Sequence, residues 1–273
     1  MKPYPVNLDF SRPQVMAIIN VTPDSFYAGS RTFASDEIAR RVERAASEGA
    51  NFLDVGGYSS RPGAADVTPD EEFSRVARAM KEIRLRLPDM PVSVDTFRGS
   101  VARRVLDEFG EVIINDISAG MLDDSIVDVA AEYDVPYIAM HMRGTPVSMQ
   151  NMTHYTDVVA DVVAYFKQRT AELQDRGVTK LIIDPGFGFA KNTAQNYDLL
   201  RQLHQLVDLG FPVLAALSRK SMIYRVLDTT PDQALAGSIA LGWEALRQGA
   251  TILRVHDVHE AVDTVRLFQT FKG

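Results

Sequence analysis

Polar residues that could bind a small molecule stand directly after short apolar runs in this sequence. Asp95, Asn115 and Asp184 offer carboxylate and amide groups, which form hydrogen bonds with the edge of a planar ring that carries N–H donors. Glycine-rich stretches at 56–57 and 186–188 let the backbone approach a flat ligand closely. This combination predicts a pocket for a nitrogen-rich heterocycle.

A second group of residues suits an anion. Cations and hydrogen-bond donors follow other apolar runs, at Ser60, Arg61, Arg219, Lys220, Arg254 and His256. Together with backbone N–H groups at helix starts, such side chains bind phosphate. One polar residue after a strand is ordinary, but a polar set after every apolar run indicates a shared site, because buried polar groups without partners are unfavourable. The residues alone therefore predict a phosphate-bearing heterocycle as the ligand.

Eight short apolar runs must position these residues. Most are rich in Val, Ile or Leu and do not alternate polar with apolar residues, which is typical of strands buried on both faces of a parallel sheet. The predicted strands cover 15–20, 52–56, 92–95, 112–116, 137–140, 181–184, 213–216 and 252–255.

Helical patterns lie between the predicted strands. Thr68 and Thr230, each followed by a proline, predict helix N-termini with capping boxes. Glycines at 49, 110, 177, 210 and 249 stand where helices should end. The predicted helices cover about 36–48, 69–87, 99–109, 125–133, 155–176, 194–209, 234–248 and 259–271.

This alternation predicts an α/β protein with a single (β/α)₈ TIM barrel over residues 1–273 and an active site at the C-terminal ends of the strands. No linker rich in Pro, Gly or Ser divides the chain. A doubly wound open sheet is the alternative, but it would usually contain fewer strands.

Composition narrows the function classes. The chain has 29 Lys and Arg against 36 Asp and Glu, a net charge of −7, which argues against a nucleic-acid partner. It has no cysteine, which excludes disulfides, thiolate nucleophiles and Cys-ligated zinc. No apolar run is long enough for a signal peptide or a membrane span, so we expect a cytoplasmic protein that does not interact with membranes.

At these same positions the sequence resembles the dihydropteroate synthase family, whose motifs it matches in order along nearly the whole chain. Each motif alone has low specificity, whereas the ordered set is highly specific. The matching segments are 20–26 (NVTPDSF), 54–57 (DVGG), 60–63 (SRPG), 94–96 (VDT), 114–117 (INDI), 140–142 (MHM), 184–189 (DPGFGF), 218–221 (SRKS) and 254–257 (RVHD).

The resemblance implies a TIM-barrel transferase of folate biosynthesis. Members join 6-hydroxymethyl-7,8-dihydropterin diphosphate to 4-aminobenzoate and release diphosphate. Sulfonamides compete with the aminobenzoate. The resemblance also implies a homodimer, to which the 155–176 helix is expected to contribute an apolar face, and two mobile loops, at 22–26 and 59–63, that order over the site.

The resemblance further implies roles for individual residues. Lys220, Asp95, Asp184 and Arg254 would be catalytic, and Asn20 would bind Mg²⁺. The residues that would bind the pterin diphosphate are Ser60, Asp95, Asn115, Asp184, Lys220, Arg254, Val255 and His256. The residues that would bind 4-aminobenzoate are Arg61, Pro62, Phe189, Ser218 and Lys220. One departure is Tyr58-Ser59-Ser60, where many members have Glu-Ser-Thr, so Tyr58 receives no role.

Several of these residues also have simpler interpretations. Asp95 and Asp184 could be N-caps of the helices that follow them, because Asp is a favoured cap. Lys220 could form a Schiff base, as barrel aldolases do. His256 and His259 could bind zinc, although no third ligand converges on them in the sequence.

Two other functions stay open at this level. A folate-to-corrinoid methyltransferase would use the same pterin-reading Asp and Asn residues, but it would not need the 218–220 and 254–256 segments as a site for diphosphate and aminobenzoate. A pterin-binding paralogue without turnover is the second alternative, against which the complete set of strand-end residues argues.

Overall fold

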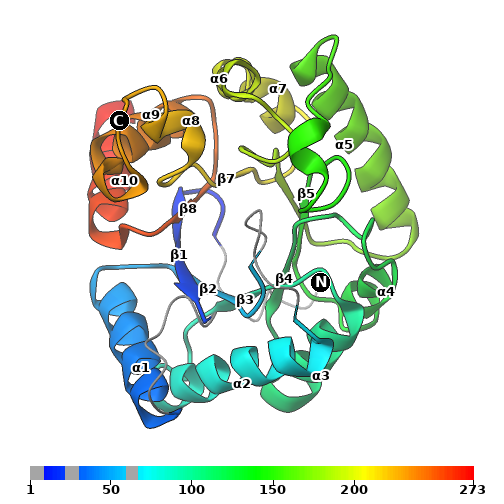
Figure 1. Cartoon of the computed structure of the whole chain (residues 1–273), viewed down its shortest axis with the longest axis vertical. Helices are drawn as coiled ribbons and strands as arrows, with labels where there is room; N and C mark the ends of the chain where they lie inside the picture. Colours follow the sequence, from blue (N-terminus) through cyan, green and yellow to red (C-terminus); the bar gives the residue numbers. More distant parts are fainter. Residues whose placement is uncertain (1–8, 22–30, 60–66) are drawn as a thin grey trace.

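The computed structural model describes residues 9–21, 31–59 and 67–273, and in them eight parallel strands form one sheet (Figure 1). The order is β6-β5-β4-β3-β2-β1-β8-β7. A parallel bridge between Ile183 and Val213 joins the two end strands, so the sheet closes into a barrel. The strands are β1 (Gln14–Asn20), β2 (Phe52–Gly56), β3 (Val92–Asp95), β4 (Ile113–Asp116), β5 (Tyr137–Met140), β6 (Leu181–Asp184), β7 (Leu214–Ala215) and β8 (Ile252–Val255).

Helices surround the barrel, as Figure 1 shows. They are α1 (Arg31–Ser47), α2 (Pro69–Arg86), α3 (Gly99–Phe109), α4 (Ser125–Glu132), α5 (Val158–Asp175), α6 (Thr193–Arg201), α7 (His204–Val207), α8 (Ser221–Tyr224), α9 (Leu235–Arg247) and α10 (Val258–Lys272). The barrel class and all eight strands are thereby confirmed, with strand boundaries within two residues of the predicted ones. Nothing in the structure tests the prediction of a single domain over the whole chain.

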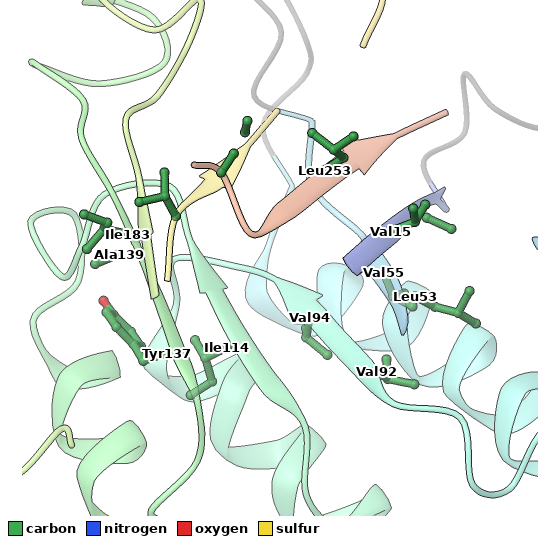
Figure 2. Packing of buried hydrophobic residues seen from close by; sticks show 14 of the residues in the cluster. Val15, Leu53, Val55, Val92, Val94, Ile114, Tyr137, Ala139, Ile183 and Leu253 are labelled. Carbon is green, nitrogen blue, oxygen red and sulfur yellow. The ribbon is translucent and has the colours of Figure 1, made fainter. Parts of the chain in front are cut away.

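Two apolar layers hold the barrel together. The outer layer packs the strands against the helices, and Figure 2 shows strand residues of it such as Val15, Leu53, Val94 and Ile183. The inner layer fills the barrel and consists of Met16, Phe52, Ile113, Ile138, Ile182, Leu214, Ala216 and Ile252, with Phe10 against it. Because both faces of each strand are buried, the strands appear in the sequence as continuous apolar runs.

The inner layer also determines where the polar residues lie. Side chains alternate along a strand, so a residue two positions further on points to the same face. On four strands the position two residues beyond a member of the inner layer is polar: Asp54, Asn115, Asp184 and Arg254. An apolar floor therefore directly underlies a polar mouth at the carboxyl ends of the strands.

Several helix predictions were wrong in detail. The helix predicted over 194–209 is two helices, α6 and α7, and at the break the N–H groups of Gln202 and Leu203 both donate to the Leu200 carbonyl. The helix predicted from residue 155 begins at Val158, because the Asp157 carboxylate accepts the N–H groups of Val159 and Ala160.

The two predicted capping boxes have different outcomes. The Thr68 hydroxyl accepts the Glu71 N–H and caps α2, but the Glu71 carboxylate accepts from Arg75, so the cap is confirmed without the reciprocal half of the box. Thr230 makes no such side-chain bond, and the residues after it, Pro231–Gln233, form a separate 3₁₀ turn before α9. Among the helices of the described residues, none combines the length and apolarity that crossing a bilayer requires.

Candidate active site

Strand register places three of the predicted site residues, Asn20, Asp95 and Asn115, at one level of the barrel, together with Gly56. Asn20 of β1 pairs with Gly56 of β2, Gly56 pairs with Asp95 of β3, and Asp95 pairs with Asn115 of β4. A Cβ atom at Gly56 would lie 3.6 Å from the Asn20 Oδ1 atom and 3.5 Å from the Asp95 Cβ atom. These are ordinary contact distances, so Gly56 lies directly between two functional side chains.

The side chain of Arg254, which lies on β8 near the C-terminal end of the sequence, reaches this row. Its guanidinium donates to the Asp54 carboxylate at 2.6 Å and to the Asp95 carboxylate at 2.7 Å. Asp54 is fully buried, and it also accepts hydrogen bonds from the Asn115 side-chain amide at 3.2 and 3.3 Å. Two carboxylates therefore share one guanidinium in the mouth of the barrel, and Asp54 orients two predicted ligand-binding residues.

Asp54 is a residue whose role the sequence prediction missed. It occurs in the matched 54–57 segment, but it received no role. The available signal was its position: a carboxylate two residues after Phe52, a member of the inner apolar layer, must point into the barrel and requires a buried partner.

Burial determines the protonation behaviour of the acidic residues here. It raises the pKa of Asp95 to about 7, with a further upward contribution from the Asp54 carboxylate and a downward one from Arg254. Burial likewise raises the pKa of Asp184, against the effects of the Lys220 ammonium and of the Gly186 N–H bond. Both carboxyl groups therefore depend on neighbouring cations and donors to remain ionised.

Lys220 lies across the mouth from this row, in the segment after β7. Its ammonium donates to the Phe187 carbonyl and lies 5.2 Å from the centre of the Phe189 ring. Burial lowers the pKa of Lys220 to about 8, whereas the Asp184 carboxylate raises it. Lys220 therefore forms one unit with the β6–α6 loop, which carries both phenylalanines.

Ser218 and His256 complete the described part of the site, whereas the Val255 side chain packs against the outer apolar layer. The Ser218 hydroxyl lies 3.0 Å from the His256 Nδ1 atom and accepts the His256 backbone N–H at 3.2 Å. Val255 is the last residue of β8 and pairs with Ala17 of β1. The β7 and β8 ends are thus joined directly through Ser218 and His256.

Arg219 fixes the chain between Ser218 and Lys220. It adopts a left-handed backbone conformation, with φ of 56°, which is unfavourable for a residue with a side chain. Its guanidinium binds both oxygens of Asp257 at 2.7 and 2.9 Å and donates to the carbonyls of Pro231 and Asp232. Arg219, predicted as an anion-binding residue, is instead occupied by this structural contact.

Two of the simpler interpretations, helix capping by Asp95 or Asp184 and a zinc site at His256 and His259, are not supported by the geometry. Asp95 caps no helix, because α3 begins after Arg98. Asp184 accepts the Gly186 N–H at 2.7 Å within a turn, and α6 is capped by Asn192 instead. His259 lies on an exposed part of α10 near Asp263, whereas His256 contacts Ser218.

Three predicted residues, Ser60, Arg61 and Pro62, lie outside the described residues, as do most of the two loops at 22–26 and 59–63. Tyr58 is described. Its ring contacts Phe97 edge to face at 5.3 Å, and the Arg98 guanidinium lies 5.2 Å from its centre. An aromatic and cationic cluster therefore occupies the place of the carboxylate that many family members have.

Comparison with known proteins identifies the class to which this barrel and its polar mouth belong. Residues 16–256 match the family model described as pterin binding enzyme. The chain is 42% identical to the dihydropteroate synthase of Haemophilus influenzae, over 98% of both proteins. It therefore belongs to the dihydropteroate synthases, the pterin-binding enzymes of folate biosynthesis.

Solved structures agree with this membership. A Xanthomonas albilineans dihydropteroate synthase with 4-aminobenzoic acid superposes with a TM-score of 0.90 and 40% identity, covering 97% of this chain and 95% of that one. The Xanthomonas albilineans enzyme in complex with 7,8-dihydropteroate gives a TM-score of 0.87 and 38% identity, covering 97% and 96%.

Proposed function

We propose that this chain condenses 6-hydroxymethyl-7,8-dihydropterin diphosphate with 4-aminobenzoate to form 7,8-dihydropteroate and diphosphate. The observation that carries the proposal is the common level of Asn20, Asp95 and Asn115, to which Arg254 is hydrogen-bonded. A ring of acceptors and amides of this kind matches the N–H groups of a pterin edge. Asp184 and Lys220 would complete the ring, with Lys220 donating to an acceptor on the pterin.

The diphosphate would bind on the β8 side of the mouth. The Nη1 group of Arg254 makes no hydrogen bond to the described residues, so it can donate to a phosphate oxygen while Asp54 and Asp95 hold the other nitrogens. His256 follows Arg254 on the same strand end, and its backbone and ring are held by Ser218. Ser60 and the backbone of Val255, whose side chain packs outward, would provide the remaining phosphate contacts.

Mg²⁺ fits this arrangement through Asn20. The side-chain oxygen of Asn20 faces the space above Gly56, beside Asp95, and no three His, Asp or Glu side chains of the described residues form a metal cluster. Magnesium is commonly held by one or two protein oxygens together with substrate phosphates. Bound between Asn20 and the diphosphate, it would neutralise charge on the leaving group.

The chemical step needs held reactants more than a protein nucleophile. The bond between the pterin methylene carbon and the diphosphate oxygen breaks, and its electron pair leaves with the diphosphate. The electron-rich dihydropterin would stabilise the resulting cation, with Asp95 and Asp184 nearby as negative charges. The amine of 4-aminobenzoate then forms the C–N bond and loses a proton. Arg254 and His256 stabilise the departing charge, and binding supplies the orientation.

The aminobenzoate would lie between the β6–α6 loop and the end of β7. Phe189 offers an aromatic wall, and Ser218 offers a hydroxyl near the carboxylate, with Lys220 between the two substrates. Arg61 and Pro62 belong to the proposed subsite by family resemblance. Sulfonamides, which compete with aminobenzoate in this family, would occupy the same place.

A diphosphate-release assay with and without 4-aminobenzoate tests the proposal. Release with both substrates, together with dihydropteroate formation, is the expected result. Tight pterin diphosphate binding without product would instead indicate a non-catalytic paralogue, and methyl transfer from a folate to a corrinoid would indicate the methyltransferase. Trapping with pterin diphosphate alone tests the dissociative order, which is wrong if a competent enzyme never releases diphosphate under those conditions.

We also propose a cytoplasmic homodimer, as the family resemblance suggests. The predicted dimer helix, α5, places Val159, Val162 and Phe166 in the core of its own barrel. The α9–α10 face is the better candidate. Leu267 is 65% exposed and Phe271 81% exposed, and the Phe271 ring lies 5.8 Å from that of Trp243. A contiguous exposed apolar surface of this kind favours association with a second copy.

A further inference from the structure

Lys191 lies near the end of the β6–α6 loop. It is a buried lysine, only 6% exposed. Its ammonium group makes no salt bridge to the described residues. Instead it lies 3.0 Å from each of three neutral acceptors: the carbonyls of Gly186 and Phe189 and the His141 Nδ1 atom. A protonated lysine has three N–H donors and no acceptor, so these contacts use all of them. Its partners come from two elements, the end of β5 and the β6–α6 loop.

The protonation state of His141 allows it to accept a hydrogen bond from Lys191. Burial and the nearby Lys191 ammonium lower the pKa of His141 well below its ordinary value, so the imidazole is neutral. The protonated Lys191 has no lone pair, so in that form Nδ1 accepts and the ring proton lies on Nε2. Lys191 thus donates to the histidine.

The three bonds fix the shape of the β6–α6 loop. The Phe189 N–H donates to the Gly186 carbonyl at 3.1 Å, which makes a turn, and Ala190 then adopts a left-handed conformation with φ of 50°. Lys191 folds back over this turn and binds the carbonyls at both of its ends. The Asn196 side chain holds the loop from the other side, through the Gly188 N–H and the Lys191 carbonyl.

This loop is also the support of Lys220. The Phe187 carbonyl accepts a hydrogen bond from the Lys220 ammonium, and this ammonium lies over the Phe189 ring. Lys191 therefore lies behind the proposed aminobenzoate subsite without lining it. A shift of the turn would displace the aromatic wall and the Lys220 acceptor together.

A buried cation without a contacting carboxylate is energetically unfavourable, which makes its presence informative. Burial lowers the pKa of Lys191 to about 7, with Lys220 and Arg143 acting in the same direction and Asp184 opposing them. An apolar side chain would fill the space without this penalty. Lys191 instead makes three polar contacts that fix a loop of the active site.

We propose that Lys191 is a positioning residue for the second substrate, holding Phe189 and the Lys220 acceptor in place through its bonds to Gly186, Phe189 and His141. This inference rests on the proposed function, because it assigns 4-aminobenzoate to the Phe189 side of the mouth. It predicts an effect on aminobenzoate that exceeds the effect on the pterin, because Phe189 belongs to the aminobenzoate side alone, whereas the pterin ring would also be held by Asp95 and Asn115 on other strands.

Steady-state diphosphate release by the Lys191→Met enzyme tests this role. Methionine keeps the length and apolar bulk and removes all three donors. We expect the KM for 4-aminobenzoate to rise about tenfold or more, as the loss of charged hydrogen bonds implies, and the KM for pterin diphosphate, which Lys220 also contacts, to rise by a clearly smaller factor. Lys167→Met on the exposed face of α5 is the matched control and should leave both constants unchanged.

A double-mutant cycle with Phe189→Leu adds a readout that a general loss of stability would not give. If Lys191 acts through Phe189, the two effects on the aminobenzoate KM are less than additive.

The His141→Phe variant keeps the ring that packs on Tyr165 and removes one acceptor of Lys191. It should therefore give a smaller change in the same direction. It also tests the proposal by itself if the Lys191→Met variant does not fold.

The outcomes separate this inference from the proposed function. No diphosphate release by the unmodified enzyme with both substrates refutes the function itself. An active enzyme whose Lys191→Met variant, or His141→Phe variant, changes neither KM or changes both equally refutes the positioning role, as does strict additivity with Phe189→Leu.

Discussion

The guanidinium of Arg254 lies 2.6 Å from the carboxylate of Asp54, across the interior of the barrel from β8 to β2. The two residues are 200 positions apart in the sequence. Asp54 is fully buried and also accepts from Asn115, so this one carboxylate orients a proposed phosphate-binding residue and a proposed pterin-binding residue.

Asp54→Asn should therefore impair the enzyme, although Asp54 itself is not proposed to contact substrate. The amide keeps the volume but removes the charge that holds Arg254, and loss of a charged hydrogen bond costs roughly 1.5–3 kcal/mol, so kcat/KM for pterin diphosphate should fall at least about tenfold. Steady-state kinetics measure this. Asp263→Asn, which alters an exposed contact with His259, is the control, and equal kinetics for the two variants would contradict the role.

Lys220→Met and Asp184→Asn should each abolish most turnover. Asp184 is buried and Lys220 half-buried in the mouth, where an electrostatic contact with the reacting molecule is worth on the order of 10²- to 10³-fold in kcat. Circular dichroism melting should show that both variants remain folded. A folded Lys220→Met enzyme with normal turnover would remove Lys220 from the mechanism.

The pH profile of kcat/KM for pterin diphosphate should fall above about pH 8. Burial lowers the pKa of Lys220 to about 8, so the side chain loses its proton, and with it the donor for the pterin, as the pH rises through that value. Profiles of kcat/KM report groups of the free enzyme. In a Lys220→Arg variant the guanidinium stays charged, so the alkaline limb due to this group should vanish from whatever activity remains. An unchanged limb would assign it to another group.

Arg61→Ala should weaken the binding of 4-aminobenzoate more than the binding of pterin diphosphate. Arg61 lies outside the described residues, so its placement rests on the matched 60–63 segment and requires a functional test. Removing one cation from a carboxylate subsite should raise the KM for aminobenzoate about tenfold. Separate KM measurements for the two substrates check this, and equal losses for both would place Arg61 elsewhere.

Phe271→Glu should shift the oligomeric state toward monomer. The side chain is 81% exposed beside Trp243 and Leu267, so a charge there adds no strain within the chain but opposes burial against a second copy. Sedimentation or light scattering measures the mass of both proteins. Leu85→Glu, at an exposed site on α2, is the control. A wild-type monomer, or a variant that remains dimeric, would exclude this surface.

The sequence by itself determined the barrel and most of its boundaries. Apolar runs such as 137–140 and 181–184 match the observed strands residue for residue, because a strand buried on both faces requires apolar residues locally, whatever its neighbours are. The ordered motifs likewise identified the family before any contact was known. Helix ends fixed by one local bond, such as the Thr68 cap, were predicted correctly.

Tertiary structure alone decided which side chains serve substrate and which serve each other. Arg219 and Arg254 look alike in the sequence, yet one is held by Asp257 in a structural contact and the other faces the mouth from β8. Closure of the barrel brings Arg254 beside Asp54, and the turn after β6 brings Lys191 to His141. Such partners depend on register and on the path of the chain through space, which no local pattern records.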